Sequence, residues 1–466
     1  AHPATGDPGL PRPSPGALLD MEERIKQRIK GALVGMFVGD ALGVPVHWMY
    51  NRDNIVRDFG AVEGYVQLKP VHPESMLSGM AYRPEAPGFD ILHGRAKHYL
   101  GDMSAGGRGS FTDEHGNTLS VPPAARLHYH YGLDAGDHTV NMWLPRLLFR
   151  DVAARDGYSA VGYLEAFRDF MLTPDSHRDT YLEVFVRRFF EEHSRGVPLP
   201  ECACDQRRVW SIGSTTGINV GVPMAAAKAM ELLPAVLREH ALPEGDGEPS
   251  AGLRGALDAV AAAATEAATA HSRLTHVSIN VEEALAVVVP LLVDMFAGLP
   301  ARSSILRACA RTRLPVISGD ELLAKYRRNN GPGNIPDDEM YALHRDFKPG
   351  FLDPEPWLAE EDNTVVGSLL SHACYTEHGL PSALYLAYKY VRPASEATDC
   401  GFRAALVADT NAGGDCTSRN CVVGCILGAA AGFDALPGDL REGLLGGPAI
   451  FDEVDAFLAR AAAPLV

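Results

Sequence analysis

The feature that most constrains this chain is a helical segment that is apolar on every side. Near the C-terminus, residues 421–432 read CVVGCILGAAAG and include no charged side chain. A helix with this composition is stable in water only when other elements cover its whole circumference. The sequence therefore predicts that this helix lies at the centre of a large core.

A polar stretch, DTNAGGDCTSRN at 409–420, leads into that apolar helix. Gly413 and Gly414 allow a tight turn, Asp415 is placed to cap the helix, and Thr417 adds a hydroxyl in the first turn. Polar groups held at the end of a buried helix are positioned rigidly enough to bind a metal ion or an anion. Simple capping by Asp415 is the structural alternative.

Composition limits the classes of protein to which the chain can belong. With 46% hydrophobic and 22% charged residues, 466 residues can bury a large core. The net charge of −17 argues against a nucleic-acid or anionic-membrane partner, since those surfaces attract Lys and Arg clusters. We expect a small-molecule substrate, no nucleic-acid partner and no membrane partner, and the oligomeric state stays open.

Cysteine usage and hydropathy bear on location. Eight cysteines are too few to form a disulfide scaffold in a chain of this length, and three of them lie on or beside the apolar helix. The longest apolar run, 284–293, is about half a bilayer span and contains Pro290. We expect a protein without a transmembrane segment in the cytoplasm, with an organelle after removal of a transit peptide as the alternative.

Helical periodicity dominates the sequence and predicts an all-α fold. A first helix is expected from Met21, and further helices at 155–172, 180–192, 224–239, 253–271, 282–296, 304–311, 320–328, 364–376, 382–390, 396–408 and 420–431.

Residues 1–20, rich in Pro and Gly, are expected to be a disordered leader. One large domain at 21–466 is expected, with a loop-rich insertion at 53–123 and an acidic surface loop at 240–252. A hairpin or two is expected around 111–121.

Two other polar stretches border predicted helices. Asp137 immediately precedes one helix, with His138 and Asn141 in its first turn. The other stretch follows the first helix and contains His47, Trp48 and Tyr50, of which the two aromatic residues are candidates for stacking on a ring. Three independent caps explain this pattern poorly, so we expect the three stretches to meet in one cavity.

Longer segments at the two ends of the chain resemble a known family. GALVGMFVGDALGVPV at 31–46, GLPSALYLAYKY at 379–390 and NAGGDCTSRNCVVGCILGAAAGFDALP at 411–437 together resemble the ADP-ribosylglycohydrolase family. The resemblance implies a fold of orthogonally packed helices and hydrolysis of an N- or O-ribosyl bond at a binuclear magnesium centre. It also places Asn219 in a central segment that contacts substrate.

The chain departs from the motifs of typical members, which are GDALGAPVE, TDDTE and GGDTDT. His47 stands in the place of the glutamate of the first motif. Asp137 is retained in the second motif, but His138 replaces its second aspartate. Asp415 is retained in the third, but its neighbours Cys416, Thr417 and Ser418 differ. Two of the four metal-binding aspartates are therefore present.

These departures leave the cofactor open. Mg²⁺ prefers carboxylates and water, so two Mg²⁺ ions held by Asp137 and Asp415 alone would be poorly compensated. Histidine favours Mn, Fe or Zn, and one such ion bound by Asp137, His138, Asp415 and Thr417, to which His47 could add a second imidazole, is a chemically sensible alternative. The absence of any metal is an equally plausible alternative.

The expected function is hydrolysis of a glycosidic bond in a small ribosyl or nucleotide-like substrate. Asp137 would orient or deprotonate water, Asp415 would lie opposite it, and His47 would act as acid or base. The expected catalytic residues are Asp137, His138, His47, Asp415 and Cys416, and the expected substrate-binding residues are Trp48, Tyr50, Asn141, Asn219, Gly413 and Gly414.

Two other functions stay open. One is a metal-independent lyase, isomerase or hydrolase that uses the histidines and Cys416, because the positive end of a helix dipole lowers a thiol pKa. The other is a non-catalytic protein that binds a small molecule. Both share the expected cavity and differ in its chemistry.

Overall fold

The computed structural model describes residues 15–75, 88–95, 109–112, 118–121, 127–155, 157–245, 247–312, 352–367 and 369–463. Within these ranges the protein is predominantly helical, which confirms the all-α prediction. The helices are α1 (Pro15–Gly43), α2 (Arg52–Phe59), α4 (Trp143–Arg155), α5 (Ala160–Leu172), α6 (Val184–Ser194), α7 (Thr216–Glu239), α8 (Ala251–Ser272), α9 (Ile279–Ala297), α10 (Ala301–Arg311), α13 (Asp362–Val365), α14 (Thr376–Tyr390), α15 (Phe402–Ala412), α16 (Cys416–Ala431), α17 (Gly438–Gly443) and α18 (Gly447–Ala461).

Strands are few and short in the described part of the chain. β1 (Gly109–Thr112) and β2 (Thr118–Val121) form an antiparallel hairpin, which confirms the hairpin expected near 111–121. β3 (Cys204–Asp205) and β4 (His276–Val277) form a two-residue parallel pair. The core therefore consists of packed helices.

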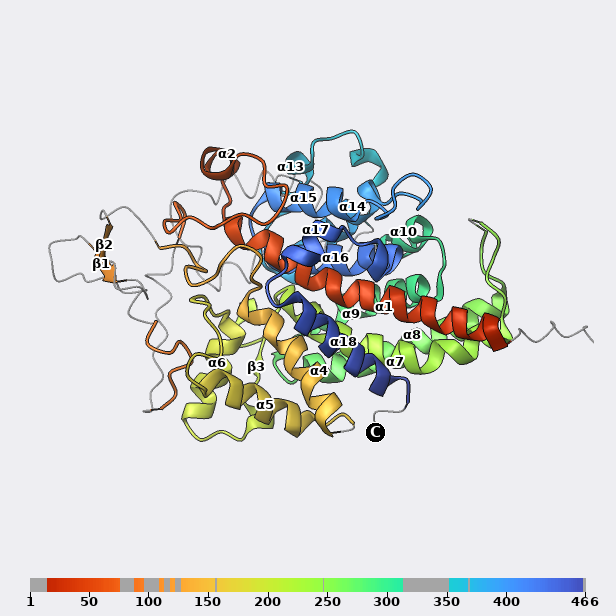
Figure 1. The fold of residues 1–466 in the computed structure, drawn as a ribbon, viewed down its shortest axis with the longest axis horizontal. Helices are drawn as coiled ribbons and strands as arrows, with labels where there is room; N and C mark the ends of the chain where they lie inside the picture. Colours follow the sequence, from red (N-terminus) through yellow and green to blue (C-terminus); the bar gives the residue numbers. More distant parts are fainter. Residues whose placement is uncertain are drawn as a thin grey trace, which may run out of the picture.

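The apolar segment forms the second half of α16, whose residues from Cys416 to Ala429 are all buried. α1 packs along α16, and α7, α9, α14 and α15 also contact α16 (Figure 1). The prediction of a fully enclosed central helix is confirmed.

Glycines allow α1 and α16 to lie with their backbones in contact. A Cβ atom on Gly35 would lie 2.2 Å from the carbonyl oxygen of Gly424, and one on Gly424 would lie 2.2 Å from the carbonyl oxygen of Gly35. Gly31 and Gly428 form a similar pair one turn away. The two helices are therefore antiparallel and closer than any side chain on these positions would permit.

Two helical segments are long and apolar enough to cross a membrane, 19–46 and Thr216–Glu239. The most apolar stretch of the first is completely buried inside the protein, and 56% of that of the second is buried. This burial is typical of core helices, whose apolar surface contacts other helices.

Several helix boundaries differ from the prediction for local reasons. No helix spans 364–376, because α13 ends at Val365 and Gly367 adopts a φ of 117°; α14 begins only at Thr376. The helix expected at 155–172 begins later, at Ala160 of α5, since Arg155 ends α4 and Ser159 caps the start of α5 by accepting from the N–H of Gly162.

Other boundaries shift without changing the architecture. α15 starts at Phe402, after Gly401 with a φ of 85°, and not at 396. α16 starts at Cys416, four residues before the expected start at 420. α1 starts at Pro15, inside the segment expected to be a disordered leader. The helix expected at 320–328 lies outside the described residues.

Candidate active site

The turn between α15 and α16 is fixed to the segment that follows α1. Gly413 and Gly414 have φ angles of 73° and 65°, in the left-handed region that favours glycine. The N–H of Trp48 donates to the carbonyl oxygen of Gly414 at 2.7 Å, and the N–H of Gly414 donates to that of Met49 at 2.8 Å. A Cβ on Gly414 would lie 2.2 Å from the carbonyl oxygen of His372. Both glycines therefore shape the turn that presents Asp415.

A buried ion pair supports the same turn from beneath. The guanidinium of Arg419 is enclosed and contacts the carboxylate of Asp409 through Nε. It also donates to the carbonyl oxygen of Gly413 at 2.7 Å. Burial raises the pKa of Asp409 to about 6, although the charge of Arg419 opposes this shift. Arg419 thus ties the first turn of α16 to the glycine turn.

Asp415 and His47 meet at the bottom of this turn, although 368 residues separate them in sequence. Nε2 of His47 lies 2.9 Å from Oδ1 of Asp415, and Oγ1 of Thr417 lies 3.2 Å from the same nitrogen. Burial lowers the pKa of His47 to about 4, against the hydrogen bond with Asp415. Burial alone would raise the pKa of Asp415, but the hydrogen bond and charge of His47 and the charge of Arg419 lower it.

A second histidine extends this contact into a chain. Nδ1 of His47 lies 2.6 Å from Nε2 of His130, and Nδ1 of His130 lies 2.7 Å from Oδ1 of Asp179. Asp179 also accepts from the N–H groups of Val140 at 2.9 Å and Tyr181 at 3.1 Å. Burial opposes ionisation of Asp179, but the charge and hydrogen bond of His130 outweigh it and lower the pKa.

The chain Asp415, His47, His130 and Asp179 places two imidazole rings between two carboxylates. Each of its three hydrogen bonds needs one proton between the two atoms that it joins. The lowered pKa values of both end carboxylates indicate that each accepts from the ring nitrogen that it contacts. The hydrogen bonds at the two ends therefore fix the orientation of both rings.

A second buried carboxylate, Glu183, lies beside Asp415. Oε1 of Glu183 accepts from Nδ2 of Asn141 at 2.5 Å and from Oγ1 of Thr216 at 2.6 Å. Oγ1 of Thr216 lies 3.0 Å from Oγ of Ser418, which in turn hydrogen-bonds Asp415. Burial, followed by the charge of Asp415, raises the pKa of Glu183 to about 7. Two hydroxyls thus connect two carboxylates with opposite pKa shifts.

The starts of several helices supply this cluster. Asn141 precedes α4 by two residues, Glu183 is the N-cap of α6, Thr216 begins α7, and Asp415 is the N-cap of α16. Asn219, in the first turn of α7, donates to the carbonyl oxygen of Ser418 at 3.1 Å. N–H groups at helix starts lack intrahelical acceptors, which makes this region electropositive around the carboxylates.

Asp137 lies apart from this cluster. Its carboxylate pairs with Arg178 and accepts from the N–H of Asp134 at 3.1 Å, in a partly exposed position. Since no contact between Asp137 and Asp415 is found among the described residues, their expected convergence is not observed. The physical reason is that Asp137 ends a turn that faces Arg178 at the surface.

His138 is buried but is turned away from Asp415. Its Nδ1 lies 3.0 Å from the carbonyl oxygen of Thr139, and its Nε2 lies 3.2 Å from a guanidinium nitrogen of Arg146. Burial lowers the pKa of His138 to about 4. Thr139 itself binds Asp40 of the first motif through its N–H at 2.6 Å and its Oγ1 at 2.8 Å.

The structure places Cys416 in surroundings that disfavour the thiolate on which the expected reactivity depends. Its thiol is buried and donates to the carbonyl oxygen of Gly43 at 3.4 Å. Burial raises the pKa of Cys416 well above the ordinary thiol value, and this outweighs the effect of the helix start. Cys416 therefore fills space between α16 and the end of α1.

The aromatic candidates line the histidine side of the cluster. The Trp48 ring lies 5.5 Å from that of His47 and 5.1 Å from that of Tyr181. Trp48 has a φ of 66° and a buried Nε1 with no hydrogen-bond partner among the described residues. The Tyr50 ring lies 4.9 Å from that of His372.

Comparison with known proteins settles the family. The family model of ADP-ribosylglycohydrolase matches residues 21–465. The chain belongs to the ADP-ribosylglycohydrolase family. The chain is also similar to a solved structure described as an ADP-ribosylglycohydrolase-related protein complex, with a TM-score of 0.47, 16% sequence identity and coverage of 94% of this chain and 99% of that chain. No curated protein matches the sequence.

The family implies a metal centre, and the candidate ligands in this chain do not fit two magnesium ions. The described residues include no group of three or more His, Cys, Asp or Glu side chains that could hold a metal ion. Both ring nitrogens of His47 are engaged, and Asp137 is bound to Arg178. A metal at Asp415 would have to displace these hydrogen bonds, so we assign no chemical step to one.

The family motifs did not reveal Asp179, His130 or Glu183 as site residues. Asp179 and Glu183 lie in the loop before α6, where no family motif marks them. A signal was nevertheless present, because an aspartate and a glutamate close to a helix start are candidates for a polar cluster. His130 lies in the alternating His and Tyr stretch 128–131, which none of these motifs includes.

Proposed function

We propose that this protein hydrolyses the bond between ribose and an N- or O-linked group in an ADP-ribose-like substrate. Glu183 would be the general acid and Asp415 the general base. One observation carries the proposal: two buried carboxylates, joined through Thr216 and Ser418, have pKa values displaced in opposite directions. Such a split is typical of paired carboxylates that divide acid and base roles.

The proposed reaction follows from these protonation states. Glu183, protonated near neutral pH, donates its proton to the leaving nitrogen or oxygen as the bond to the ribose carbon breaks. Asp415, ionised, removes a proton from the water whose oxygen forms the new bond. The developing positive charge on the ribose is stabilised by the Asp415 carboxylate. His47 positions Asp415 by binding Oδ1.

Unpaired buried atoms support a polar ligand beside these carboxylates. Oδ1 of Asn141 and Nε1 of Trp48 are buried without a hydrogen-bond partner among the described residues. Buried polar atoms rarely remain unpaired in proteins, and hydroxyl groups of a ribose offer both donors and acceptors. Asn141 and Trp48 are therefore proposed to contact the sugar.

A small-molecule-binding protein without catalysis is the second candidate. It is favoured by the loss of the metal ligands of the family and by the engagement of His47 in the chain to Asp179. This candidate predicts binding of an ADP-ribose-like ligand without turnover.

The test is release of ADP-ribose from N-linked and O-linked ADP-ribosyl substrates by the purified full chain, with magnesium and with a chelator. Glu183→Gln and Asp415→Asn should each lower kcat by about 10²–10⁴-fold, as expected for loss of a positioned acid or base. Asp137→Asn, a matched change at the surface pair with Arg178, should retain activity.

Two results would contradict the proposed hydrolase. Tight ligand binding by the unaltered protein with no release of product would establish the binding protein instead. If Asp137→Asn lost as much activity as Asp415→Asn, the reaction would depend on the two aspartates retained from the family motifs and not on Glu183 with Asp415. Melting temperatures of each variant would show that the comparison is made between folded proteins.

A further inference from the structure

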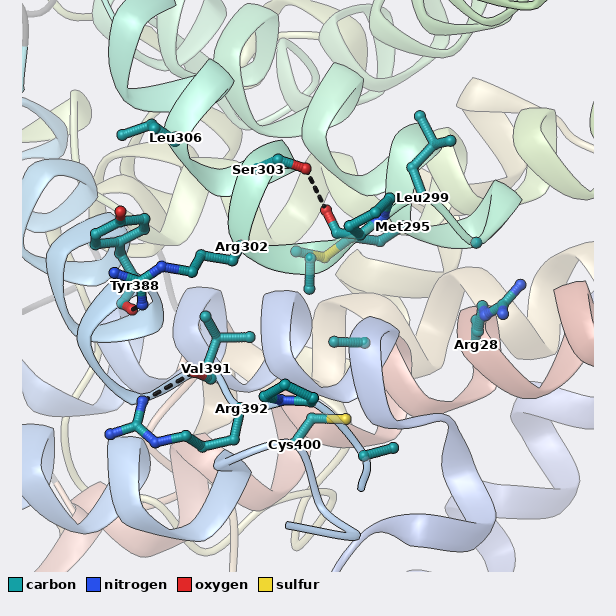
Figure 2. A pocket seen from close by; sticks show the side chains of 16 residues that line it. Arg28, Met295, Leu299, Arg302, Ser303, Leu306, Tyr388, Val391, Arg392 and Cys400 are labelled. Atoms are coloured by element: carbon teal, nitrogen blue, oxygen red, sulfur yellow. Dashed lines mark hydrogen bonds between the residues drawn. The ribbon is translucent and has the colours of Figure 1, made fainter. Parts of the chain in front are cut away.

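A pocket lies at the opposite end of the α1 and α16 pair from the histidine chain. Its volume is about 550 Å³, and its walls come from α1, the start of α10, the end of α14 and the end of α16 (Figure 2). Ala430 lines this pocket, whereas Cys416 lies beside the carboxylate cluster. Between these residues α16 rises about 21 Å at 1.5 Å per residue, so the two sites are separate.

The charge of this pocket is opposite to that of the whole protein. The chain has 59 acidic and 42 basic residues, yet the described residues that line the pocket include Arg28, Arg302 and Arg392 and no aspartate or glutamate. Figure 2 shows Arg302 and Arg392 near Tyr388, with Arg28 on the other side of the pocket. The cavity is therefore a concentrated positive site on an acidic protein.

Protein carboxylates compensate these arginines only in part. Arg28 makes a long contact of 3.5 Å with the carbonyl oxygen of Phe296 and has no carboxylate within ion-pair distance in the described part of the chain. Burial, together with the nearby charge of Arg24, lowers the pKa of Arg28, which indicates an uncompensated charge.

Arg392 and Arg302, the other two arginines of the pocket, have different contacts from Arg28. Arg392 donates to the backbone carbonyl oxygens of Lys389 and Val391, each at 2.9 Å. Arg302 lies over the Tyr388 ring at 4.1 Å and approaches Glu355 at 3.6 Å. Arg392 thus retains an unneutralised guanidinium, while Arg302 is fixed in direction by an aromatic ring and a weakly paired acid.

The start of α10 adds to the positive potential. Ala301, Arg302 and Ser303 form its first turn and line the pocket, and the N-cap residue Pro300 provides no side-chain cap. The N–H groups of a first helical turn favour anions. Leu299, Leu306 and Val391 supply apolar wall surface in the same cavity.

We propose that this arginine pocket binds a small organic anion, a phosphate or carboxylate group attached to an apolar body. The anionic group would lie between the start of α10 and the guanidinium groups, and the apolar body would contact Leu299, Leu306 and Val391. The volume is within the range of about 300–1,000 Å³ found for small-molecule sites. This site is independent of the proposed hydrolysis.

The test is calorimetric titration of the full chain at low salt with phenyl phosphate, benzoate, inorganic phosphate and benzyl alcohol. We expect at least one of the two organic anions to bind with a Kd below about 1 mM, and more tightly than inorganic phosphate or benzyl alcohol. Comparison of phenyl phosphate with benzoate identifies the preferred anionic group. Equal affinity for inorganic phosphate would overturn the role of the apolar walls, and binding of benzyl alcohol alone would overturn the role of charge.

Variants locate the site. Arg28→Met, Arg302→Gln and Arg392→Gln should each weaken binding by tenfold or more, because each removes a guanidinium. Arg311→Gln, at the exposed far end of α10, is the matched control and should bind as the unaltered protein does. Since Arg392 is exposed and bonded only to backbone oxygens, its variant should fold normally. Unchanged affinity in all three pocket variants, or no binding of any anion, would overturn the proposal.

Discussion

At the scale of single residues, the clearest property of the site is that burial acts differently on two neighbouring carboxylates. Asp415 is ionised because His47 and Arg419 outweigh the effect of burial, whereas Glu183 has only neutral hydrogen-bond donors and retains its proton. The difference lies in the partners that each carboxylate has within the same core. The division of roles between acid and base follows from it.

This difference predicts a pH profile. The acid Glu183 must carry a proton, so kcat/KM should fall as the pH rises above about 7, the pKa to which burial raises this residue. The hydrogen bond from Thr216 lowers that pKa, so Thr216→Val should move the alkaline limb to higher pH. Thr265→Val, which removes only a contact with Ala261 in α8, is the control and should leave the limb in place.

A profile measured as kcat/KM against pH would check this assignment. An alkaline limb that does not move in Thr216→Val would show that another group donates the proton. A limb that moves equally in Thr265→Val would indicate a global effect on the protein and not one on Glu183.

A second residue-scale prediction compares two aspartates that each contact a basic side chain. Asp179 is buried against His130, whereas Asp137 meets Arg178 in a partly exposed position. Asp179→Asn disrupts a buried carboxylate that accepts from His130 and from the N–H groups of Val140 and Tyr181, and it should lower the free energy of unfolding by about 1–3 kcal/mol or more. Asp137→Asn should lower it by at most about 1 kcal/mol. Urea denaturation measures both, and similar losses would contradict the structural role of buried Asp179.

At the scale of elements, the packing of α1 on α16 depends on the absence of side chains. Gly35→Ala places a methyl group where the carbonyl oxygen of Gly424 lies only 2.2 Å away, so the helices must separate. We expect a loss of about 1–3 kcal/mol or more, typical of overpacking. Gly255→Ala in α8 has no atom within 4 Å of the new Cβ and should stabilise the protein by about 0.5–1 kcal/mol.

Thermal or urea unfolding of these two variants tests the helix contact. Both substitutions raise helix propensity equally, so the difference between them isolates the contact between the helices. A Gly35→Ala variant as stable as Gly255→Ala would show that α1 and α16 can move apart without cost.

The helices α1 and α16 also show which features of the fold could be predicted from the sequence. The enclosure of α16 was predictable, because an apolar circumference requires burial whatever the neighbours are. The partner helix was harder to identify, although glycines recur at every fourth position of α1, at Gly31, Gly35 and Gly39. That spacing indicates a face for close helix contact but does not say which helix occupies it.

The site was only partly predictable, because the sequence does not say which side chains from different helices meet. The motifs pointed to His47 and Asp415, which do meet, because both lie at ends of the two glycine-paired helices. They also pointed to Asp137, but the direction of its side chain depends on the turn before α4 and on the ion pair with Arg178. Glu183 and Asp179 escaped notice, since their roles arise from burial beside other helix starts and not from a local pattern.

At the scale of the whole molecule, buried histidines should dominate the response to acid. Burial lowers the pKa of eight histidines to about 4 or about 3: His47, His72, His138, His177, His271, His276, His372 and His378. Between pH 4 and about 6.5 the unfolded chain binds protons at these rings and the folded protein does not. The stability that they contribute is therefore present above about pH 6.5 and is lost as the pH falls toward 4.

Four buried carboxyl groups act in the opposite direction. Burial raises the pKa of Asp40, Glu183 and Glu377 to about 7 and that of Asp409 to about 6. Their stability contribution is present at low pH and is lost as the pH rises through these values. Because the histidines outnumber them, the melting temperature should rise from pH 4.5 to about 6.5 and then level or decline. A melting temperature that falls across the first interval would contradict this balance.

The union of α1 and α16 has a consequence for biosynthesis. Gly43 and Cys416 touch in the finished protein but are separated by 373 residues. At about 5–20 residues per second, a ribosome needs roughly 20–75 s to make the second helix after the first. Throughout that interval the apolar faces of α1 lack their final cover, so we expect the nascent chain to bind holding chaperones until synthesis is nearly complete.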